Sequence, residues 1–433
     1  MSDQRIKVID SYPGSGKTST MIDYINQLDE DTKVIYITPF LSECDRIIKN
    51  TNKYFIQPDP RRGRGRKMDH LVQLVTDGKN IVSTHALFSN IDDELINALK
   101  SNNYILILDE TMNVVENFDL YRDIRMDDDR RQNVTKSDIK SLVSKSYLEI
   151  NDDYSVSWVS EDRLERYEPL RHLADRNLLY FINDSLLVWT FPIEVFMPGI
   201  FEEIYILTYL FDYQIQSLYY NYFGLDYSIS HIENIDNKYT LVDTKNNQEE
   251  LLWKEKIKEL ITIIDNSKIN RIGGVYNDSR NHPVKSSLSK SWFDNNPKLV
   301  KKLSNDIVNF FSHYTNTKTN QRMWTCFKND VNKLTAKNLS KKSWLEITSR
   351  AVNDYGDRLA LAYCINRFPN PFFEHFFYKR NVIINEDEFA LAEMIQWVWR
   401  SAIRNFEPIT IYVPSERMRT LFIKWLNNEK IEF

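Results

Sequence analysis

Short apolar runs alternate with helix-periodic segments through the first quarter of the chain. The runs at residues 6–9, 33–38, 80–84 and 104–108 are rich in Ile, Val and Leu, which is typical of buried strands. Between the first two runs, the apolar residues of segment 19–28 recur at helical spacing. Because strands that alternate with helices usually form parallel sheets, this pattern predicts an α/β domain with a parallel central sheet.

The pattern weakens after residue 110 and then returns. Residues 112–180 are polar and prone to form helices, so we expect a solvated helical excursion there, with charge clusters such as "MDDDRRQ" at 126–132. The stretch 178–192 ("LLYFINDSLLVWTFP") predicts a hairpin, and 202–215 ("EEIYILTYLFDYQI") predicts a strand that ends at Leu207–Thr208.

A second half with its own core is predicted beyond a polar, hinge-like region at residues 220–250. Segment 269–278 could open this core, and a helix at 304–314 is followed by a strand at 321–327. A chain of 433 residues is also too long for one ordinary domain. We therefore predict two domains, at residues 1–220 and 250–433.

The last part of the chain continues the α/β pattern. A strand is predicted to end near Thr348, before a polar, glycine-bearing turn at 353–358 and another apolar run. Period and propensity then predict a helix over Asp387–Asn405 and a strand over 407–414.

Composition excludes several classes of protein. The net charge of −5 provides no overall basic field, so any nucleic acid would have to be held by local patches. The cysteines (Cys44, Cys326 and Cys364) have no disulfide or zinc spacing, and the histidines have no metal-ligand spacing. Without a signal peptide or an apolar run of membrane-spanning length, we expect a soluble cytoplasmic protein that does not bind membranes.

The stretch "IDSYPGSGKTST" at residues 9–20 points to a nucleotide. It lies between a predicted strand and a predicted helix, and it contains two of only ten glycines, Gly14 and Gly16. Backbone N–H groups at such a helix start attract phosphate, Lys17 would reach the terminal phosphates and Thr18 would hold Mg²⁺. Ser11 stands where the general P-loop has its first glycine. We predict that ATP or GTP is bound by Pro13, Gly14, Ser15, Gly16, Lys17, Thr18 and Ser19.

The stretch "YILILDET" at residues 104–111 supplies carboxylates for the same chemistry. Its apolar run predicts a central strand, and Asp109 and Glu110 would lie at the carboxyl end, where ligands bind in open α/β sheets. We expect Asp109 to bind Mg²⁺ and Glu110 to polarise the attacking water.

The order of these strand ends resembles a known family. A strand ending in Thr38-Pro39, a second ending in Ser83-Thr84-His85 and a third ending in Asp-Glu, after a G-S-G-K-T loop, resemble motifs I, Ia, Ib and II of superfamily 2 DNA helicases. The resemblance implies two RecA-like (P-loop NTPase) domains in tandem with parallel central sheets, and ATP with Mg²⁺ between them. It also implies that Thr38, Pro39, Ser83 and Thr84 contact the sugar-phosphate backbone of the tracked strand, with His85 near that path.

Other parts of the chain extend the resemblance. Thr208 matches the last residue of motif III, and the turn at 353–358 looks like motif V. Motif VI, Q-x-x-G-R-x-x-R, is matched by Gln396 and Arg400 on one predicted helix face, whereas Trp399 replaces the glycine and Arg404 comes one residue late. The resemblance implies that these arginines meet the charge that develops on the γ-phosphate. An amphipathic helix with exposed arginines is the alternative interpretation.

The basic run "RRGRGRK" at residues 61–67 lies between the strands assigned to motifs Ia and Ib. We expect Arg64 and Lys67 to meet phosphate there, with the two glycines keeping the run flexible. A solvated loop is the alternative.

The motif order, with "TPFLSEC", "STHALF", "LDET", "IQWVWRSAIR" and "IYVPSERMR", is similar to that of small bacteriophage-encoded helicases. This implies an ATP hydrolase that translocates on single-stranded or forked DNA and unwinds duplexes in phage DNA replication, with other replication proteins as partners, in the host cytoplasm. Two alternatives stay open: a terminase-type packaging ATPase, and an ATP-dependent switch or scaffold that does not translocate. No small-molecule substrate other than nucleotide is expected.

Overall fold

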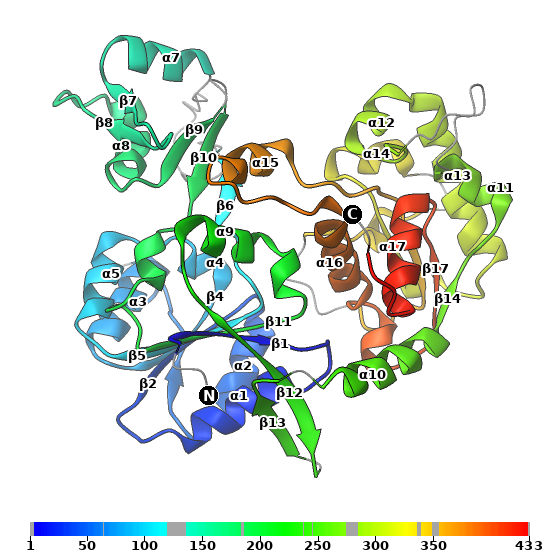
Figure 1. Cartoon of the computed structure of the whole chain (residues 1–433), viewed down its shortest axis with the longest axis horizontal. Helices are drawn as coiled ribbons and strands as arrows, with labels where there is room; N and C mark the ends of the chain where they lie inside the picture. The colour runs from blue at the N-terminus through cyan, green and yellow to red at the C-terminus, as the bar shows by residue number, and fades with distance from the viewer. Residues whose placement is uncertain are drawn as a thin grey trace. The chain divides into compact units, whose positions relative to one another are not determined.

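The computed structural model describes residues 4–63, 65–118, 136–182, 186–236, 238–244, 246–273, 285–335, 339–348 and 355–431. The chain divides into two compact units (Figure 1). The first unit comprises Met1–Ile9, Met21–Ile229 and Asn370–Ile384, and the second comprises Asp10–Thr20, Ser230–Pro369 and Asn385–Phe433. Among the described helices, none is long and apolar enough to cross a membrane.

The central sheet of the first unit is parallel, as the sequence predicted. Its strands are ordered β1-β11-β5-β2-β4-β3, and β12 and β13 extend the sheet beyond β1. The pairs β11–β5, β5–β2, β2–β4 and β4–β3 are all parallel. The strands are β1 (Ile6–Asp10), β2 (Lys33–Thr38), β3 (Phe55–Ile56), β4 (Asn80–Thr84), β5 (Tyr104–Asp109), β11 (Glu203–Thr208), β12 (Ser228–Ile235) and β13 (Lys238–Val242).

Apolar side chains explain why these strands are central. In β5 every residue from Tyr104 to Leu108 is buried, and in β11 the same holds from Ile204 to Thr208. The helices supply the other side of the core through apolar stripes, and α3 and α5 lie side by side (Figure 1). The helices are α1 (Lys17–Gln27), α2 (Leu41–Asn50), α3 (Lys67–Thr76), α4 (His85–Phe88), α5 (Asp93–Lys100) and α9 (Ile215–Phe223).

The region expected to be a helical excursion is instead a small folded module. It has a three-stranded sheet ordered β6-β10-β9, a hairpin β7–β8, and two helices over a separate apolar cluster. The predicted hairpin at 178–192 is confirmed as the antiparallel pair β9–β10. The charged segment 126–132 lies outside the described residues. The elements are β6 (Val115–Asn117), α7 (Lys136–Ser144), β7 (Leu148–Ile150), β8 (Val156–Trp158), α8 (Glu168–Asp175), β9 (Leu179–Ile182) and β10 (Leu186–Thr190).

A segment from the second half of the chain belongs to the first unit. Helix α15 (Pro371–Tyr378) contributes Phe376, whose ring stacks on Tyr222 with centroids 4.4 Å apart and meets Tyr180 edge-on at 5.2 Å. The C-terminal half is therefore not one continuous domain over 250–433. The hinge-like region at 220–250 contains the end of α9, the hairpin β12–β13 and the start of α10 (Asn247–Leu260).

The second unit has its own parallel sheet, ordered β14-β17-β16-β15, whose pairs are all parallel. Its core is formed by apolar residues of the sheet, α12 and α13. The strands and main helices are β14 (Ile261–Ile263), α12 (Lys290–Asn295), α13 (Pro297–His313), β15 (Arg322–Thr325), α14 (Val331–Leu334), β16 (Ala360–Tyr363), α16 (Glu386–Val398), β17 (Ile409–Tyr412) and α17 (Glu416–Leu426).

Two predictions for this unit are wrong. Within the described segment 339–348, no strand ends near Thr348: Trp344 makes an isolated bridge with Trp324, and Ile347 and Thr348 form a turn. The helix predicted over Asp387–Asn405 ends at Val398. The predicted helix and strand at 304–314 and 321–327, and the strand at 407–414, are confirmed by α13, β15 and β17.

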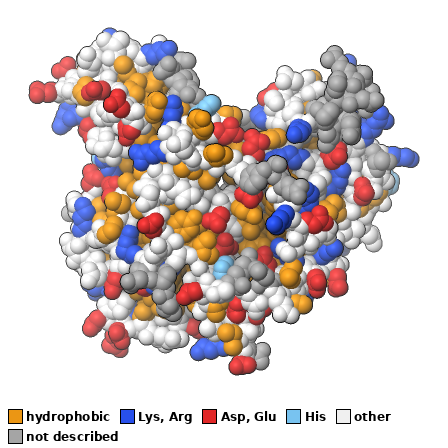
Figure 2. All heavy atoms as spheres, viewed as in Figure 1, with side chains coloured by type: hydrophobic (Ala, Val, Ile, Leu, Met, Phe, Trp, Pro, Cys, Tyr) orange, Lys and Arg blue, Asp and Glu red, His pale blue; other side chains and the backbone are white. Residues whose placement is uncertain are grey.

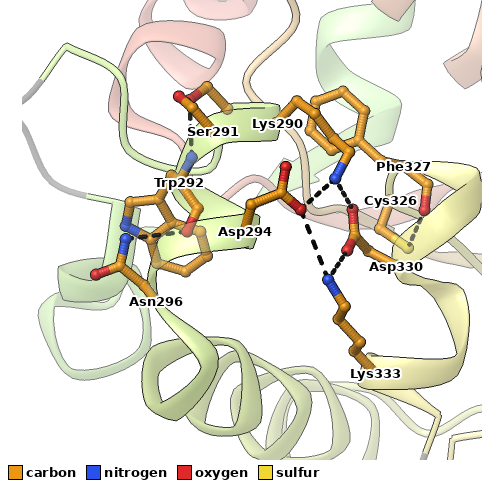
Figure 3. Close-up of polar contacts among 10 residues, drawn as sticks. Lys290, Ser291, Trp292, Asp294, Asn296, Cys326, Phe327, Asp330 and Lys333 are labelled. Atoms are coloured by element: carbon orange, nitrogen blue, oxygen red, sulfur yellow. Dashed lines mark hydrogen bonds and ion pairs between the residues drawn. The ribbon is translucent and has the colours of Figure 1, made fainter.

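An ion cluster around one buried carboxylate joins α12 to α14 in the second unit. The Asp330 side chain is fully buried between Lys290, at 3.2 Å, and Lys333, at 2.5 Å, and both lysines also contact Asp294 (Figure 3). Two ammonium groups compensate the buried carboxylate, which would otherwise be costly to desolvate. Elsewhere the charges are mixed: on the face drawn in Figure 2, basic and acidic side chains are interspersed.

Candidate functional site

The glycine loop that follows β1 has the backbone shape of a phosphate-binding loop. Gly14 and Gly16 have φ angles of 85° and 87°, a region that side-chain-bearing residues rarely adopt. The loop closes through a hydrogen bond from the Ser15 N–H to the Tyr12 carbonyl, at 3.1 Å, and α1 begins at Lys17. The sequence prediction of strand, loop and helix is confirmed here.

Ser11 has a structural reason to replace the usual first glycine. Its hydroxyl accepts a hydrogen bond, at 2.7 Å, from the N–H of Ile232 on β12. His231 also contacts the Asp10 carbonyl. The start of the loop is thus tied to the neighbouring strand by a side chain that glycine lacks.

Lys17 is held against the loop itself. Its ammonium group donates hydrogen bonds to the carbonyls of Ser11, at 2.6 Å, and Tyr12, at 3.2 Å. The buried Ser15 hydroxyl has no hydrogen-bond partner within the described residues. Thr18 and Ser19 are half-buried at the start of α1, where N–H groups point out of the helix. These residues fit a nucleoside triphosphate with Mg²⁺.

An aromatic ring lies against each of the two glycines. A side chain at Gly16 would come within 2.9 Å of the Tyr239 ring, and one at Gly14 would contact Trp399 at 3.6 Å. Glycine is therefore required at position 16 both by its φ angle and by the ring above it. Neither ring was singled out for such a role by the sequence patterns.

The acidic strand end of β5 is linked to two neighbouring strands. Asp109 accepts a hydrogen bond from the Tyr36 hydroxyl of β2 at 3.1 Å, and Glu110 accepts one from the Thr208 hydroxyl of β11 at 3.4 Å. Burial, and then the nearby Asp109 carboxylate, raise the pKa of Tyr36 well above its usual value. The Tyr36 hydroxyl therefore keeps its proton and donates the hydrogen bond. The contact brings the strand end assigned to motif III next to the acidic end of β5.

Glu110 has a strained backbone. Its φ angle is 71°, and its N–H donates to the Leu207 carbonyl of β11 at 2.9 Å. A non-glycine residue in this region costs about 1 kcal/mol or more, and such residues cluster at functional sites. The strain turns the chain sharply at the end of β5.

Gln214 supports this corner and was missed by sequence reasoning. Its buried amide donates to the Thr208 hydroxyl at 2.9 Å and to the Tyr209 carbonyl at 2.8 Å, and it accepts from Thr111. Only the position of Gln214, shortly after a predicted strand end, could have drawn attention to it.

The strand ends assigned to motifs Ia and Ib lie side by side. Thr38 pairs with Thr84 in the register of β2 and β4, so both strands end at the same edge as β5. The side chains of Thr38, Ser83 and His85 are buried, whereas Pro39 and Thr84 are half-buried. Contacts from the first three to a bound strand would therefore have to use their backbone.

The described residues of the basic run form turns that lead into α3. A side chain at Gly63 would clash with the Arg66 carbonyl, at 2.1 Å. The N–H of Gly65 donates a hydrogen bond to the Pro60 carbonyl at 3.0 Å. Hydrogen bonds from Arg61 hold the pKa of Asp59 at about 2. Lys67 is exposed at the start of α3, and Arg64 lies outside the described residues.

The arginines assigned to motif VI do not share one helix face. Gln396 lies in α16, but Arg400 follows the end of that helix, and Arg404 lies in a 3₁₀ turn, Ala402–Asn405. Ser401 ends the helix because its buried hydroxyl and N–H both bind the Val398 carbonyl, at 2.7 and 3.1 Å.

The segment after α16 packs on the turn assigned to motif V. The Asn405 amide donates to the Gly356 carbonyl at 3.1 Å, and the Ala402 N–H donates to the Arg358 carbonyl at 3.0 Å. Arg400 donates to the Ile347 carbonyl at 3.4 Å. Residues 355–357 form the predicted turn, whereas 353 and 354 lie outside the described residues.

Comparison with known proteins places these units in a family. Residues 130–189 match the YonV middle domain, and residues 255–426 match the YonV C-terminal Rossmann-like domain. The chain is also 37% identical to the SPbeta prophage-derived uncharacterized protein YonV of Bacillus subtilis (strain 168), over 99% of this chain and 100% of that protein. The chain belongs to the YonV family. In the terms of this family, the small module is the middle domain, and the parallel sheet of the second unit lies in the Rossmann-like domain.

Solved structures add a likeness in fold. The chain is similar to XPD in its apo form, with a TM-score of 0.50 and 10% identity over 98% of this chain and 96% of that chain. A second structure, titled XPD helicase, matches with a TM-score of 0.44 and 11% identity over 99% of this chain and 95% of that one. At this identity the first likeness concerns the fold alone, which this YonV-family chain shares with a helicase along nearly its whole length.

Proposed function

We propose that this YonV-family chain is an ATP-dependent motor that moves along single-stranded DNA and separates the strands of a duplex that it meets. One observation carries the proposal. A glycine loop with two left-handed glycines follows β1, and the same sheet contains β5, which ends in a strained Glu110 hydrogen-bonded to Thr208 of β11. The order of the other motifs and the fold shared with XPD support the helicase class over other P-loop ATPases.

In this proposal the two halves of the chain divide the chemistry. Residues Pro13–Ser19 hold the phosphates, and Thr18 and Asp109 hold Mg²⁺, which neutralises charge on the phosphates. Glu110 orients and deprotonates the attacking water. Gln396, Arg400 and Arg404 act from the other half, where a guanidinium meets the charge that develops on the γ-phosphate.

The nucleic-acid path of the proposal follows the strand ends of β2 and β4. Pro39 and Thr84 have partly exposed side chains there, and Thr38, Ser83 and His85 take part through their backbone. Lys67 contributes a charge, with Arg64 of the same basic run. The prophage origin of the B. subtilis relative fits a phage setting. Within that setting we propose a role in DNA replication, inside the host cell.

An ATPase assay with and without nucleic acid tests the proposal. Phosphate release from ATP and Mg²⁺ is measured with no nucleic acid, with single-stranded DNA and with RNA of the same sequence. A motor on DNA hydrolyses ATP much faster with single-stranded DNA, whereas a switch or scaffold shows the same rate in all three. Lys17→Ala is the control, because it removes the charge that binds the phosphates. No ATPase activity in the unaltered chain would overturn the proposal.

Strand separation needs its own measurement. A forked duplex with a fluorophore and a quencher on opposite strands brightens when a helicase opens it. Opening that requires ATP and disappears in Lys17→Ala supports a helicase. Stimulated hydrolysis without opening would reduce the proposal to a translocase, and cleavage of the DNA would favour a packaging ATPase with a nuclease.

A further inference from the structure

A stack of aromatic rings connects the glycine loop with the end of α16. The Tyr12 ring stacks on Trp253 of α10, with centroids 4.9 Å apart and planes inclined by 27°. Trp253 in turn lies 5.3 Å from Trp399, the residue after α16, and 5.9 Å from Trp425 of α17. All of these residues belong to the second unit as the contacts divide the chain. In Figure 1, α16 and α17 are neighbours.

Trp399 reaches the glycine loop by two routes. Besides the route through Trp253 and Tyr12, its ring lies against Gly14, where an added side chain would touch Cζ2 at 3.6 Å. Trp253 is buried and Trp399 is half-buried. Ring pairs at these separations attract one another beyond their apolar burial. A shift of one ring therefore displaces the rings packed against it.

The loop end of the stack is attached to the residues that respond to phosphate. Lys17 binds the Ser11 and Tyr12 carbonyls at 2.6 and 3.2 Å. If the ammonium group turns toward a triphosphate, it leaves both carbonyls. The Tyr12 carbonyl then keeps its hydrogen bond from the Ser15 N–H, so the Tyr12 ring would shift together with the glycine loop. The other end of the stack adjoins Arg400 in sequence, in a turn fixed by the Arg400 N–H on the Trp397 carbonyl at 3.2 Å.

We infer that Trp399 is a positioning residue: through its contacts with Gly14 and with the Trp253–Tyr12 stack, it sets the position of Arg400 according to whether the glycine loop holds a nucleotide. This inference rests on the proposed function, because it requires that the loop binds ATP. It also gives a role to the tryptophan that stands where motif VI has its glycine.

Tryptophan fluorescence tests the inference without relying on turnover. ATP with magnesium chloride is added to the full chain, and emission is recorded with excitation at the red edge of tryptophan absorption. We expect a change in emission that is largely lost in Trp399→Phe. The control is Trp158→Phe, in the small β7–β8 hairpin outside the stack, which should keep the change. Equilibrium dialysis with labelled ATP measures binding in all three proteins.

A double-mutant cycle tests the coupling itself. Trp399→Leu should lower kcat on the order of tenfold, as expected when a reacting group is displaced, while ATP affinity changes little. Tyr12→Leu should have a similar effect, and the double variant should be little worse than either, because both break one stack. Tyr12→Phe keeps the ring and should keep the coupling.

Each outcome has one meaning. ATP binding with an emission change that survives in Trp399→Phe, or additive losses in the cycle, would overturn the inference and leave the proposed function standing. No ATP binding by the unaltered chain would overturn both. Loss of the emission change in Trp399→Phe alone, with ATP still bound and non-additive losses in the cycle, supports the inference.

Discussion

In the first unit, strands β5 and β11 lead into Asp109, Glu110 and Thr208, whereas in the second unit β16 and β17 lead into Arg367 and Arg417. The two acids are only partly buried, and each accepts a hydrogen bond from an uncharged hydroxyl group of a neighbouring strand. The arginines are bound by carboxylates: Arg367 pairs with Glu393, and Arg417 pairs with Asp387 at 2.6 Å.

This difference distinguishes acids that the proposal uses in hydrolysis from arginines that hold the second unit together. Arg417 also donates to the Asn366 side chain at 2.9 Å and to the Arg367 carbonyl at 2.6 Å, so its guanidinium fastens the end of β16 to α17 and α16. A guanidinium used in this way is not available to a nucleotide. Arg400 and Arg404, to which the proposal gives the hydrolytic role, lie beyond α16 and outside this set of ion pairs.

The largest effect in this comparison is expected at the acidic strand end. Glu110→Gln removes the proposed base and keeps the shape and the hydrogen bond from Thr208, so ATP should still bind while turnover falls by roughly 100-fold or more. Phosphate release and equilibrium dialysis with ATP measure the two quantities. Glu116→Gln on β6 is the control and should leave both unchanged. Retained turnover in Glu110→Gln would remove Glu110 from its role.

The next largest effect is expected beyond α16. Arg400→Ala should slow hydrolysis on the order of 100-fold without weakening ATP binding, because a guanidinium acts mainly on the charge of the transition state. Arg404→Ala is the matched comparison, since Arg404 lies in a separate 3₁₀ turn. If Arg404→Ala has the larger effect, the assignment of the two arginines is reversed, and if neither slows turnover, the composite site is wrong.

An effect on folding stability is expected at Arg417, which is held in an ion pair with Asp387. Arg417→Ala leaves Asp387 without its partner and should lower the free energy of unfolding by about 2 kcal/mol, below the range for a fully buried pair because Asp387 is partly exposed. Thermal melts measure this, with Lys424→Ala on the same helix as control. Turnover per folded molecule should stay unchanged, and a loss of turnover without a loss of stability would place Arg417 in the chemistry instead.

The sequence was most informative where local and global signals agree. The strands β1, β2, β4 and β5 follow from buried apolar runs. The loop at Gly14–Gly16 and the position of Asp109–Glu110 follow from the glycines and acids at the ends of these runs. Parallel pairing then brings Thr38, Thr84 and Asp109 to one edge without further information. The strand of Thr208 was predicted in the same way, but its hydrogen bond to Glu110 depends on a backbone strain that no pattern displays.

Where long-range contacts decide the structure, the sequence misled. The apolar residues of α16 continue in register past Val398, yet the Ser401 hydroxyl binds the helix end and stops it. The region 112–180 looked solvated because its core residues, such as Leu142 and Leu170, are few and are brought together only by the fold. The same holds for the ring contacts of Tyr12, Trp253 and Trp399. The sequence marks Trp399 as a departure from motif VI but does not reveal which rings it contacts.

The smallest expected effect concerns Glu203, at the opposite, amino-terminal end of β11. It compares a structural carboxylate with Glu110, the proposed base. Burial raises the pKa of Glu203, but hydrogen bonds from Lys7, Tyr205 and Tyr24 outweigh it, so the net pKa is lowered. Because the folded state then holds the proton less tightly than the unfolded state, the stabilisation is complete above the ordinary pKa of about 4.3 and is lost as the pH falls through the lower folded value. Glu203→Gln should lower the melting temperature at pH 7 by an amount corresponding to about 1 kcal/mol or less, since the site is partly exposed, and the difference from the unaltered chain should shrink as the pH falls below 4.3. A difference that stays constant across this pH range would show that the lost contacts are those of packing and not of charge.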